Sequence, residues 1–390
     1  MLPMPWKETC KADKKVSLVG DWLSGNYTKT MLSRRYGVSR PTVDKWLNRY
    51  IDLGVDGLVE RSRRPLTCSH QTDPKVIEAI LNVKQEHVHW GPKKINDRLA
   101  SLYPEQRWPA DSTTGAILKN AGLVKPRKHK PRVSPYPHPL TSSTYSCDVW
   151  NIDFKGDKAL GNGKRCYPLT VTDDFSRYLL ACEGLESTAL ASTQVVLEKL
   201  FEEHGLPNVI KSDNGTPFAS RSIGGLSRLS IWLIKLGIVP ERIDKGCPTQ
   251  NARHERMHRV LKAETMSPMS HSFKAQQKRF DEFRFNYNEL RSHEGLNRKT
   301  PKSVYRQSPV RYSDRELRIF YADDTEIRSV KHSGEIKWKG KYVYVGQLLA
   351  CEKIALKRCG EKRWELYFGF FLLGYLNEDK MVVERIKART

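Results

Sequence analysis

Val149-Trp-Asn-Ile-Asp-Phe154 is an apolar run that contains one carboxylate, Asp153. A run of this kind predicts a buried strand, in which an unpaired carboxylate is costly. A second acid, Asp213, follows Pro207-Asn-Val-Ile-Lys-Ser212 and precedes Asn214-Gly215. Because Asn-Gly begins tight turns, Asp213 is expected at the exit of another strand.

A third acid, Glu255, lies in the helical segment Gln250-Asn-Ala-Arg-His-Glu-Arg-Met-His-Arg-Val-Leu-Lys262. On a wheel of 3.6 residues per turn, one face is apolar and should pack on a core. That face consists of Met257, Val260 and Leu261. The opposite face consists of Asn251, Glu255, His258, Arg259 and Lys262. Glu255 is therefore expected to point outward, among cations that suit a polyanion.

These three acids could together hold hard divalent cations, which prefer oxygen ligands. Two such ions about 3.5–4 Å apart can stabilise both the attacking and the leaving oxygen of a displacement at phosphorus. A single acid is most often a solvated surface charge, and Asp148, Asp173 and Asp174 are rival candidates. Asp173-Asp174 precedes Phe-Ser-Arg and fits the turn of a hairpin better.

Several stretches together resemble the catalytic core of bacterial DDE insertion-sequence transposases, a group related to retroviral integrases. They are WNIDFKG (150–156), YPLTVTDDFSRYLLAC (167–182), KSDNGTPFAS (211–220), GLSRLSIWLIKLGIVPERI (225–243), NARHERMHRVLKAE (251–264) and RSHEGLNRKTPKSVY (291–305). The resemblance implies a catalytic, metal-binding triad of Asp153, Asp213 and Glu255, with Mg²⁺ as cofactor or Mn²⁺ in its place. The interval between Asp213 and Glu255 is longer than in many relatives, which fits an inserted loop around residues 222–226.

The composition favours a nucleic-acid partner. The 390 residues include 67 Lys and Arg against 44 Asp and Glu, a net charge of +23. Such a surplus suits a polyanion. The eight cysteines show no CxxC pairs and, with the histidines, no zinc spacing, as expected for thiols in a reducing compartment. Without a signal peptide or a long apolar run, a bacterial cytoplasmic, nucleoid-associated protein with no membrane partner is expected.

Residues 11–50 have the pattern of a helix-turn-helix. Gly37-Val38 separates two helical segments, Ser39 is placed to cap the second, and Pro41 suits its first turn. Val43, Trp46 and Leu47 should pack inward. The residues left to face a major groove are Arg40, Thr42, Asp44, Lys45 and Asn48. The following segment, Arg61-Ser-Arg-Arg-Pro65, is either a solvated linker or a DNA contact through Arg61, Arg63 and Arg64.

A second helical unit is expected over residues 73–124 and resembles a winged helix-turn-helix. Its reading helix should span Ser112 to Ala121, with Ser112, Thr113 and Lys119 exposed. A basic, proline-rich linker follows over 125–140, in which Arg127, Lys128 and Lys130 could contact the DNA backbone.

The expected organisation is multidomain. It comprises an α-helical helix-turn-helix domain (1–65), the second helix-turn-helix domain (73–124), the linker (125–140), a catalytic core (141–306) and a C-terminal domain (307–390). The core should be an α/β RNase H-like domain with a mixed five-stranded sheet, in which the resemblance implies that strands one and four are neighbours. Short strands between Gly turns after residue 307 predict a small SH3-like β-barrel.

The expected function is that of a transposase. It would bind the terminal inverted repeats of its element as double-stranded DNA, cut strands with two Mg²⁺ ions and join the 3′-OH ends to target DNA. His254, His258, Arg259 and Lys262 are candidates for holding DNA near the scissile phosphate. Joining two ends implies a homo-oligomer, at least a dimer. The alternatives are a helix-turn-helix regulator with an inactive core, and an RNase H-like nuclease without strand transfer.

Overall fold

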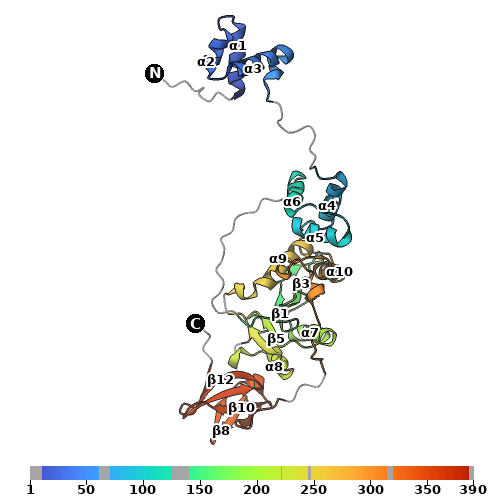
Figure 1. Ribbon diagram of the computed structural model, residues 1–390. Helices are drawn as coiled ribbons and strands as arrows, with labels where there is room; N and C mark the ends of the chain where they lie inside the picture. The colour runs from blue at the N-terminus through green and yellow to red at the C-terminus, as the bar shows by residue number, and fades with distance from the viewer. Residues whose placement is uncertain are drawn as a thin grey trace. The chain divides into compact units, whose positions relative to one another are not determined.

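The computed structural model describes residues 11–60, 71–124, 140–220, 222–244, 247–313 and 319–385. The chain divides into two compact units, residues 1–71 and 72–390 (Figure 1). The expected DNA contacts Arg61, Arg63 and Arg64 lie outside the described residues, as do Arg127, Lys128 and Lys130. Among the described helices, none has the length and apolarity needed to cross a membrane.

The first unit is helical. It contains α1 (Lys11–Leu23), α2 (Lys29–Tyr36), α3 (Arg40–Leu53) and the 3₁₀ turn η1 (Gly54–Leu58). Helix α2 ends at Gly37, whose φ of 62° is accessible to glycine at little cost, and α3 begins after Ser39. Val43, Trp46 and Leu47 are buried, as predicted, while Arg40, Lys45 and Asn48 are exposed.

The second helical segment contains α4 (Pro74–Glu86), α5 (Pro92–Leu102) and α6 (Asp111–Asn120), around a core that includes Ile80, Ile95 and Leu118. Helix α6 is the expected reading helix, and its Ser112, Thr113 and Lys119 are exposed. Residues 71–124 contain no strand, so the expected wing is absent from this stretch.

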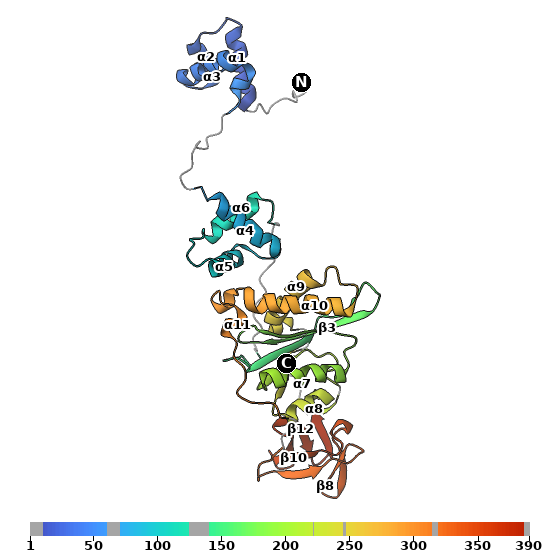
Figure 2. The same ribbon diagram turned by 90° about the vertical axis from the view of Figure 1, so that its right-hand side faces the viewer.

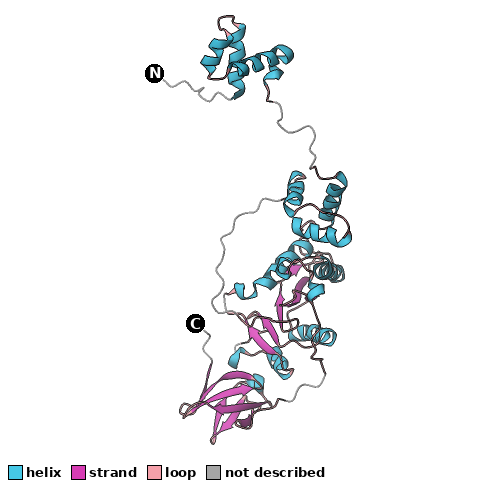
Figure 3. Cartoon of the chain, in the orientation of Figure 1, coloured by secondary structure: helices cyan, strands magenta, loops and turns pink. Residues whose placement is uncertain are grey.

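The core contains a mixed six-stranded sheet (Figure 3). Its strands are β1 (Val149–Phe154), β2 (Lys158–Ala159), β3 (Arg165–Asp173), β4 (Leu179–Leu185), β5 (Val209–Ser212) and β6 (Val239–Arg242). Strand β3 pairs antiparallel with β1, β2 and β4, whereas β1, β5 and β6 run parallel. The fourth of the expected strands is β5, because the short β2 was not expected. Its parallel pairing with β1 confirms the predicted adjacency of strands one and four. The strand beyond the expected five is β2, which has two residues.

Helices cover both faces of this sheet (Figure 2). Helices α7 (Leu190–His204) and α8 (Arg228–Lys235) pack on one face, and α9 (Ala252–Thr265) and α10 (Phe273–Phe285) pack on the other. Because side chains alternate along a strand, Trp150 and Ile152 of β1 enter the α7–α8 core. Asp153 therefore projects to the face covered by α9.

The C-terminal region is an antiparallel sheet with an added hairpin. Its strands are β7 (Glu326–Ser329), β8 (Glu335–Trp338), β9 (Lys341–Tyr344), β10 (Lys353–Arg358), β11 (Arg363–Phe368), β12 (Phe371–Asn377) and β13 (Val382–Arg385). The sheet order is β13-β12-β11-β10-β7, with β8 and β9 paired only to each other. The expectation of a barrel was wrong, because within the described residues no pairing joins the edge strands β13 and β7.

The insertion expected around residues 222–226 contains a 3₁₀ turn, Ile223–Gly225. Ile223 and Leu226 are buried in the apolar core of the C-terminal sheet, together with Leu373. Gly224 has a φ of 60°, and a Cβ added there would lie 3.2 Å from the ring of Phe371. The additional residues thus supply a packing surface for the C-terminal sheet.

Candidate active site

Strand pairing brings the first two acids of the predicted triad together. Asn151 of β1 is in register with Lys211 of the parallel strand β5. Asp153 and Asp213 each lie two residues beyond this pair, close enough for the charge of Asp213 to act on Asp153. The turn after β5 holds Asp213 in place, because the Gly215 N–H donates to its Oδ1 at 2.9 Å.

Helix α9 supplies the third acid, Glu255, from its first turn. The Glu255 side chain is half-exposed, and the Lys155 ammonium lies 3.3 Å from its Oε2. Burial, together with the negative charges of Asp213 and Glu255, raises the pKa of Asp153 to about 7 against the opposing effect of Lys155. Asp213 and Glu255 are thus each close enough to Asp153 to repel its charge, which a bound cation would relieve.

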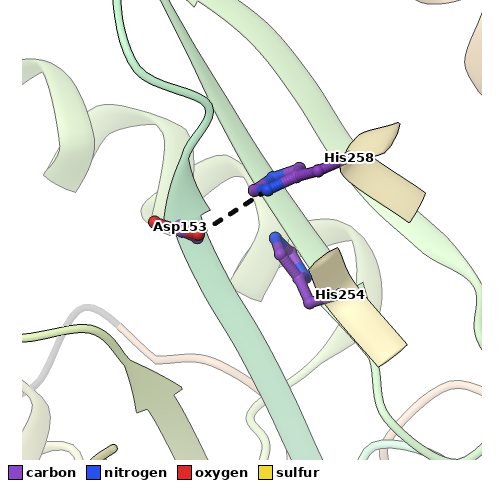
Figure 4. Close-up of side chains that lie close together, drawn as sticks. All are labelled: Asp153, His254 and His258. Carbon is purple, nitrogen blue, oxygen red and sulfur yellow. Dashed lines mark ion pairs between the residues drawn. The ribbon is translucent and has the colours of Figure 1, made fainter. Parts of the chain in front are cut away.

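Two histidines of α9 lie beside Asp153 (Figure 4). His254 and His258 are 1% and 0% exposed, so the expectation that they contact DNA was wrong. Both Nε2 atoms meet the hydroxyl of Thr170, at 2.8 Å and 2.6 Å, and His254 Nδ1 meets the hydroxyl of Thr172 at 2.7 Å. These threonines of β3 satisfy polar rings that could not otherwise be buried.

His258 Nδ1 is the one nitrogen of this histidine pair without a hydrogen-bond partner. It lies 3.6 Å from Asp153 Oδ2 and 4.0 Å from Glu255 Oε2. Burial lowers the pKa of His254 to about 3 and that of His258 well below its usual range, so both rings are neutral.

The residues present fit a hard divalent cation. Asp153, Asp213 and Glu255 supply carboxylate oxygens, the donors that Mg²⁺ and Mn²⁺ prefer. Asp153, His254 and His258 can also bring one donor atom each within 4.8 Å of one another. Since both nitrogens of His254 already face threonine hydroxyls, the carboxylates remain the better ligand set.

The rival acids have structural partners. Asp173 accepts hydrogen bonds from the backbone N–H groups of Cys147 and Ser176, which fixes the start of β1 and the β3–β4 turn. Asp174 lies in that turn and pairs with Arg253 at 2.7 Å. Asp148 accepts from the side chain of Asn208 at 3.1 Å. The interpretation of Asp173-Asp174 as a hairpin turn is confirmed.

The helical wheel predicts the outer face of α9 only in part, because Asn251 and His258 are buried. Arg259 and Lys262 are exposed, on the helix that carries Glu255. The sequence analysis did not identify Lys155, the ion-pair partner of Glu255, although Lys155 lies two residues after Asp153. The signal that could have identified it was this spacing, which puts Lys155 on the same side as Asp153.

The family comparisons agree with this geometry. Residues 145–248 match the integrase core domain family, and residues 236–301 match a second family described as an integrase core domain. The central part of this chain is therefore similar to integrase core domains. Asp153 and Asp213 lie in the first matched region, and Glu255 lies in the second. Before the core, residues 14–65 match a helix-turn-helix domain and residues 42–118 a homeodomain-like domain.

Among curated proteins, the chain is similar to products of bacterial insertion elements. It is 27% identical over 226 residues, 57% of its length, to the insertion element IS476 uncharacterized 39.2 kDa protein of Xanthomonas euvesicatoria. It is 30% identical over 190 residues, 47% of its length, to the insertion element IS407 uncharacterized 31.7 kDa protein of Burkholderia multivorans. The chain spans 62% and 65% of the lengths of these relatives.

Viral polyproteins also match. The chain is 35% identical over 202 residues, 50% of its length and 11% of the relative's, to the Gag-Pol polyprotein of baboon endogenous virus. A solved structure of the HTLV-2 integrase catalytic core domain in complex with magnesium aligns with 42% of this chain and 100% of its own, at 13% identity and a TM-score of 0.33. The assignment to integrase cores rests on the sequence matches, because a score this low does not establish a shared fold.

Proposed function

We propose that this protein is a DDE transposase that binds the terminal inverted repeats of its own insertion element and cuts and joins DNA strands there. The observation that carries the proposal is that the charges of Asp213 and Glu255 act on the buried Asp153 in a region that matches integrase core domains. The likeness to insertion-element proteins supports this choice of substrate. The same proposal places the protein in the bacterial cytoplasm, at the nucleoid.

The proposed catalytic groups are the three carboxylates, which would hold two Mg²⁺ ions, or Mn²⁺ in their place. When bound, such ions activate a water or a 3′-OH and stabilise the charge that develops at phosphorus. Lys155 neutralises Glu255 and keeps the carboxylate in place before the substrate arrives. Arg259 and Lys262 are placed on the exposed face of α9, where their charges suit a DNA backbone.

The proposed DNA readers are α3 and α6. Their exposed or half-buried polar residues could contact base edges in a major groove, as the second helix of a helix-turn-helix does. These residues are Arg40, Thr42, Lys45, Asn48, Ser112, Thr113 and Lys119. Because joining requires two ends in one complex, we infer that the active form contains at least two copies of the chain.

The joining reaction separates this function from its alternatives. Purified protein would be incubated with Mg²⁺, a target plasmid and a labelled duplex carrying the inverted repeats that flank its gene. A transposase should produce labelled plasmid. Cut duplex without joined product would indicate a nuclease, and binding without either product would indicate a regulator with an inactive core.

Base contacts and backbone contacts should respond differently to mutation. Arg40→Ala should cost about 1–3 kcal/mol in binding to end DNA and little in binding to random DNA, because a bidentate contact from Arg to guanine distinguishes bases. Lys262→Ala should weaken binding to both, and reduce the slope of log K against log salt by about one. Fluorescence anisotropy at several salt concentrations measures both effects.

Arg34→Ala provides the matched control, because Arg34 is exposed on α2, outside the proposed reading helices. It should change the ratio of specific to non-specific affinity much less than Arg40→Ala does. Equal losses of this ratio in the two variants would show that α3 does not read the bases.

A further inference from the structure

The hydroxyl of Thr170 lies at the centre of a buried cluster that it forms with His254 and His258 beside Asp153. Thr170 is in register with Asp153 on the neighbouring strand. Its Oγ1 lies 2.6 Å from His258 Nε2, 2.8 Å from His254 Nε2 and 3.1 Å from the Asp153 carbonyl oxygen. Since a hydroxyl has one hydrogen, it can donate to one of these atoms only.

Two tautomers are open to the neutral ring of His258. If the hydrogen is on Nε2, then Nδ1 directs a bare lone pair at two carboxylates, Asp153 at 3.6 Å and Glu255 at 4.0 Å. That arrangement is repulsive in a buried site, where charges are poorly screened. If the hydrogen is on Nδ1, the N–H is directed at Asp153 and gives the buried nitrogen its missing partner.

The second tautomer allows a consistent set of hydrogen bonds through the cluster. The Thr172 hydroxyl donates to His254 Nδ1, and His254 Nε2–H donates to the Thr170 oxygen. The Thr170 hydroxyl then donates to His258 Nε2 at 2.6 Å instead of to the Asp153 carbonyl oxygen at 3.1 Å, and His258 Nδ1–H faces Asp153 Oδ2. Each hydroxyl and each ring donates once, and the series ends on a carboxylate of the triad.

We propose that His258 is a positioning residue whose Nδ1–H donates to Asp153 and fixes the direction in which this carboxylate presents its oxygens to the divalent cation. The role rests on the proposed metal-dependent function. A separation of 3.6 Å fits it, because hydrogen bonds in active sites are often long before the site is complete. Hydrogen bonds to ligating carboxylates typically change metal affinity about 10–100-fold when they are removed.

Two substitutions of His258 separate its two nitrogens. His258→Asn places an amide nitrogen near the position of Nδ1, so it retains a donor to Asp153 and loses the bond to Thr170. His258→Gln reaches the position of Nε2, so it retains a bond to Thr170 and loses the donor. The dissociation constant for Mn²⁺ would be measured on the full chain by the electron paramagnetic resonance signal of free Mn²⁺.

We expect His258→Gln to raise this dissociation constant about 10–100-fold and His258→Asn to change it by less than about threefold. Three results would overturn the proposal. Both variants could bind Mn²⁺ as tightly as the parent, both could lose affinity equally, or only His258→Asn could lose affinity. Asp153→Asn identifies the site that is measured. If it leaves Mn²⁺ binding unchanged, the metal site itself is misassigned, which is a failure of the proposed function.

The tautomer of His258 can also be determined on the unaltered protein, where no substitution could prevent folding. In a two-bond ¹H–¹⁵N correlation of the full chain labelled with ¹⁵N-histidine, the His258 ring should give the pattern of a neutral Nδ1–H tautomer. The Nε2–H pattern would overturn the proposal even if both variants at this position failed to fold.

Discussion

Replacing Asp153 by asparagine should lower the rate of DNA strand cleavage about a thousandfold, because loss of a cation ligand removes several kcal/mol of charge stabilisation in the transition state. Binding to end DNA should remain within about twofold, since the proposed reading helices α3 and α6 are separate from the core sheet. Cleavage of a labelled end duplex in Mg²⁺ and its binding by anisotropy give the two values.

Asp148→Asn is the matched control for this result. The substitution makes the same chemical change at Asp148, one residue before the start of β1. There the Asp148 carboxylate accepts hydrogen bonds from Thr144 and Asn208. Its substitution should leave the cleavage rate nearly unchanged. If Asp148→Asn abolished cleavage and Asp153→Asn did not, the triad would have to be reassigned. If Asp153→Asn lost DNA binding together with cleavage, the loss of cleavage could no longer be attributed to a catalytic carboxylate.

The same Asp153→Asn substitution should stabilise the protein when no divalent cation is present. Burial, with repulsion from Asp213 and Glu255, raises the pKa of Asp153 to about 7. The folded state therefore keeps this proton up to about pH 7, whereas an unfolded chain releases it near pH 4. The free energy of unfolding consequently falls as pH rises between these values and is lowest above pH 7. In the Asp153→Asn variant the amide does not ionise, so its free energy of unfolding does not fall in this way as pH rises.

The expected gain at pH 8 has an upper bound of about 4 kcal/mol, the free energy that corresponds to this change in pKa. Thermal melts in EDTA at pH 5 and pH 8 should show a Tm several degrees above the parent's at pH 8 and a smaller difference at pH 5. Adding Mg²⁺ should stabilise the parent by mass action and affect the variant less. A lower Tm for Asp153→Asn at pH 8 would contradict the convergence of the three carboxylates.

Asp148→Asn should behave in the opposite way. Partial burial raises the pKa of Asp148, but hydrogen bonds from Thr144 and Asn208 outweigh this effect and leave the pKa below its usual value. The carboxylate of Asp148 therefore contributes stability above its unfolded pKa, and this contribution is lost as pH falls through the folded pKa. The variant should melt slightly below the parent at pH 8.

Local patterns predicted the elements that carry the site. The apolar run around Asp153, the turn after Asp213 and the helical spacing around Glu255 correspond to β1, the exit of β5 and α9. Each depends on residues close together in the sequence, where periodicity and turn chemistry act. The adjacency of β1 and β5 came from the resemblance to DDE transposases, because strand order is determined by distant residues.

The burial of His254 and His258 was not predictable from the helix alone. The helical wheel placed His258 on the outer face, but both histidines are buried with Met257 and Leu261. Thr170 and Thr172 make their burial favourable, and these partners come from a strand more than eighty residues earlier. The open C-terminal sheet was missed for a similar reason. Short alternating strands indicate a β domain and do not determine whether its edges pair.

Affinity cleavage by iron tests the central claim most directly. Fe²⁺ bound in place of Mg²⁺ produces radicals in the presence of ascorbate and peroxide, and these cut the polypeptide near the ligands. The structure predicts cuts near Asp153, Asp213 and Glu255 in the same preparation, all suppressed by excess Mg²⁺ and all lost in Asp153→Asn. Cuts near only one of these residues, or cuts that persist in the variant, would show that the three carboxylates do not hold a common cation.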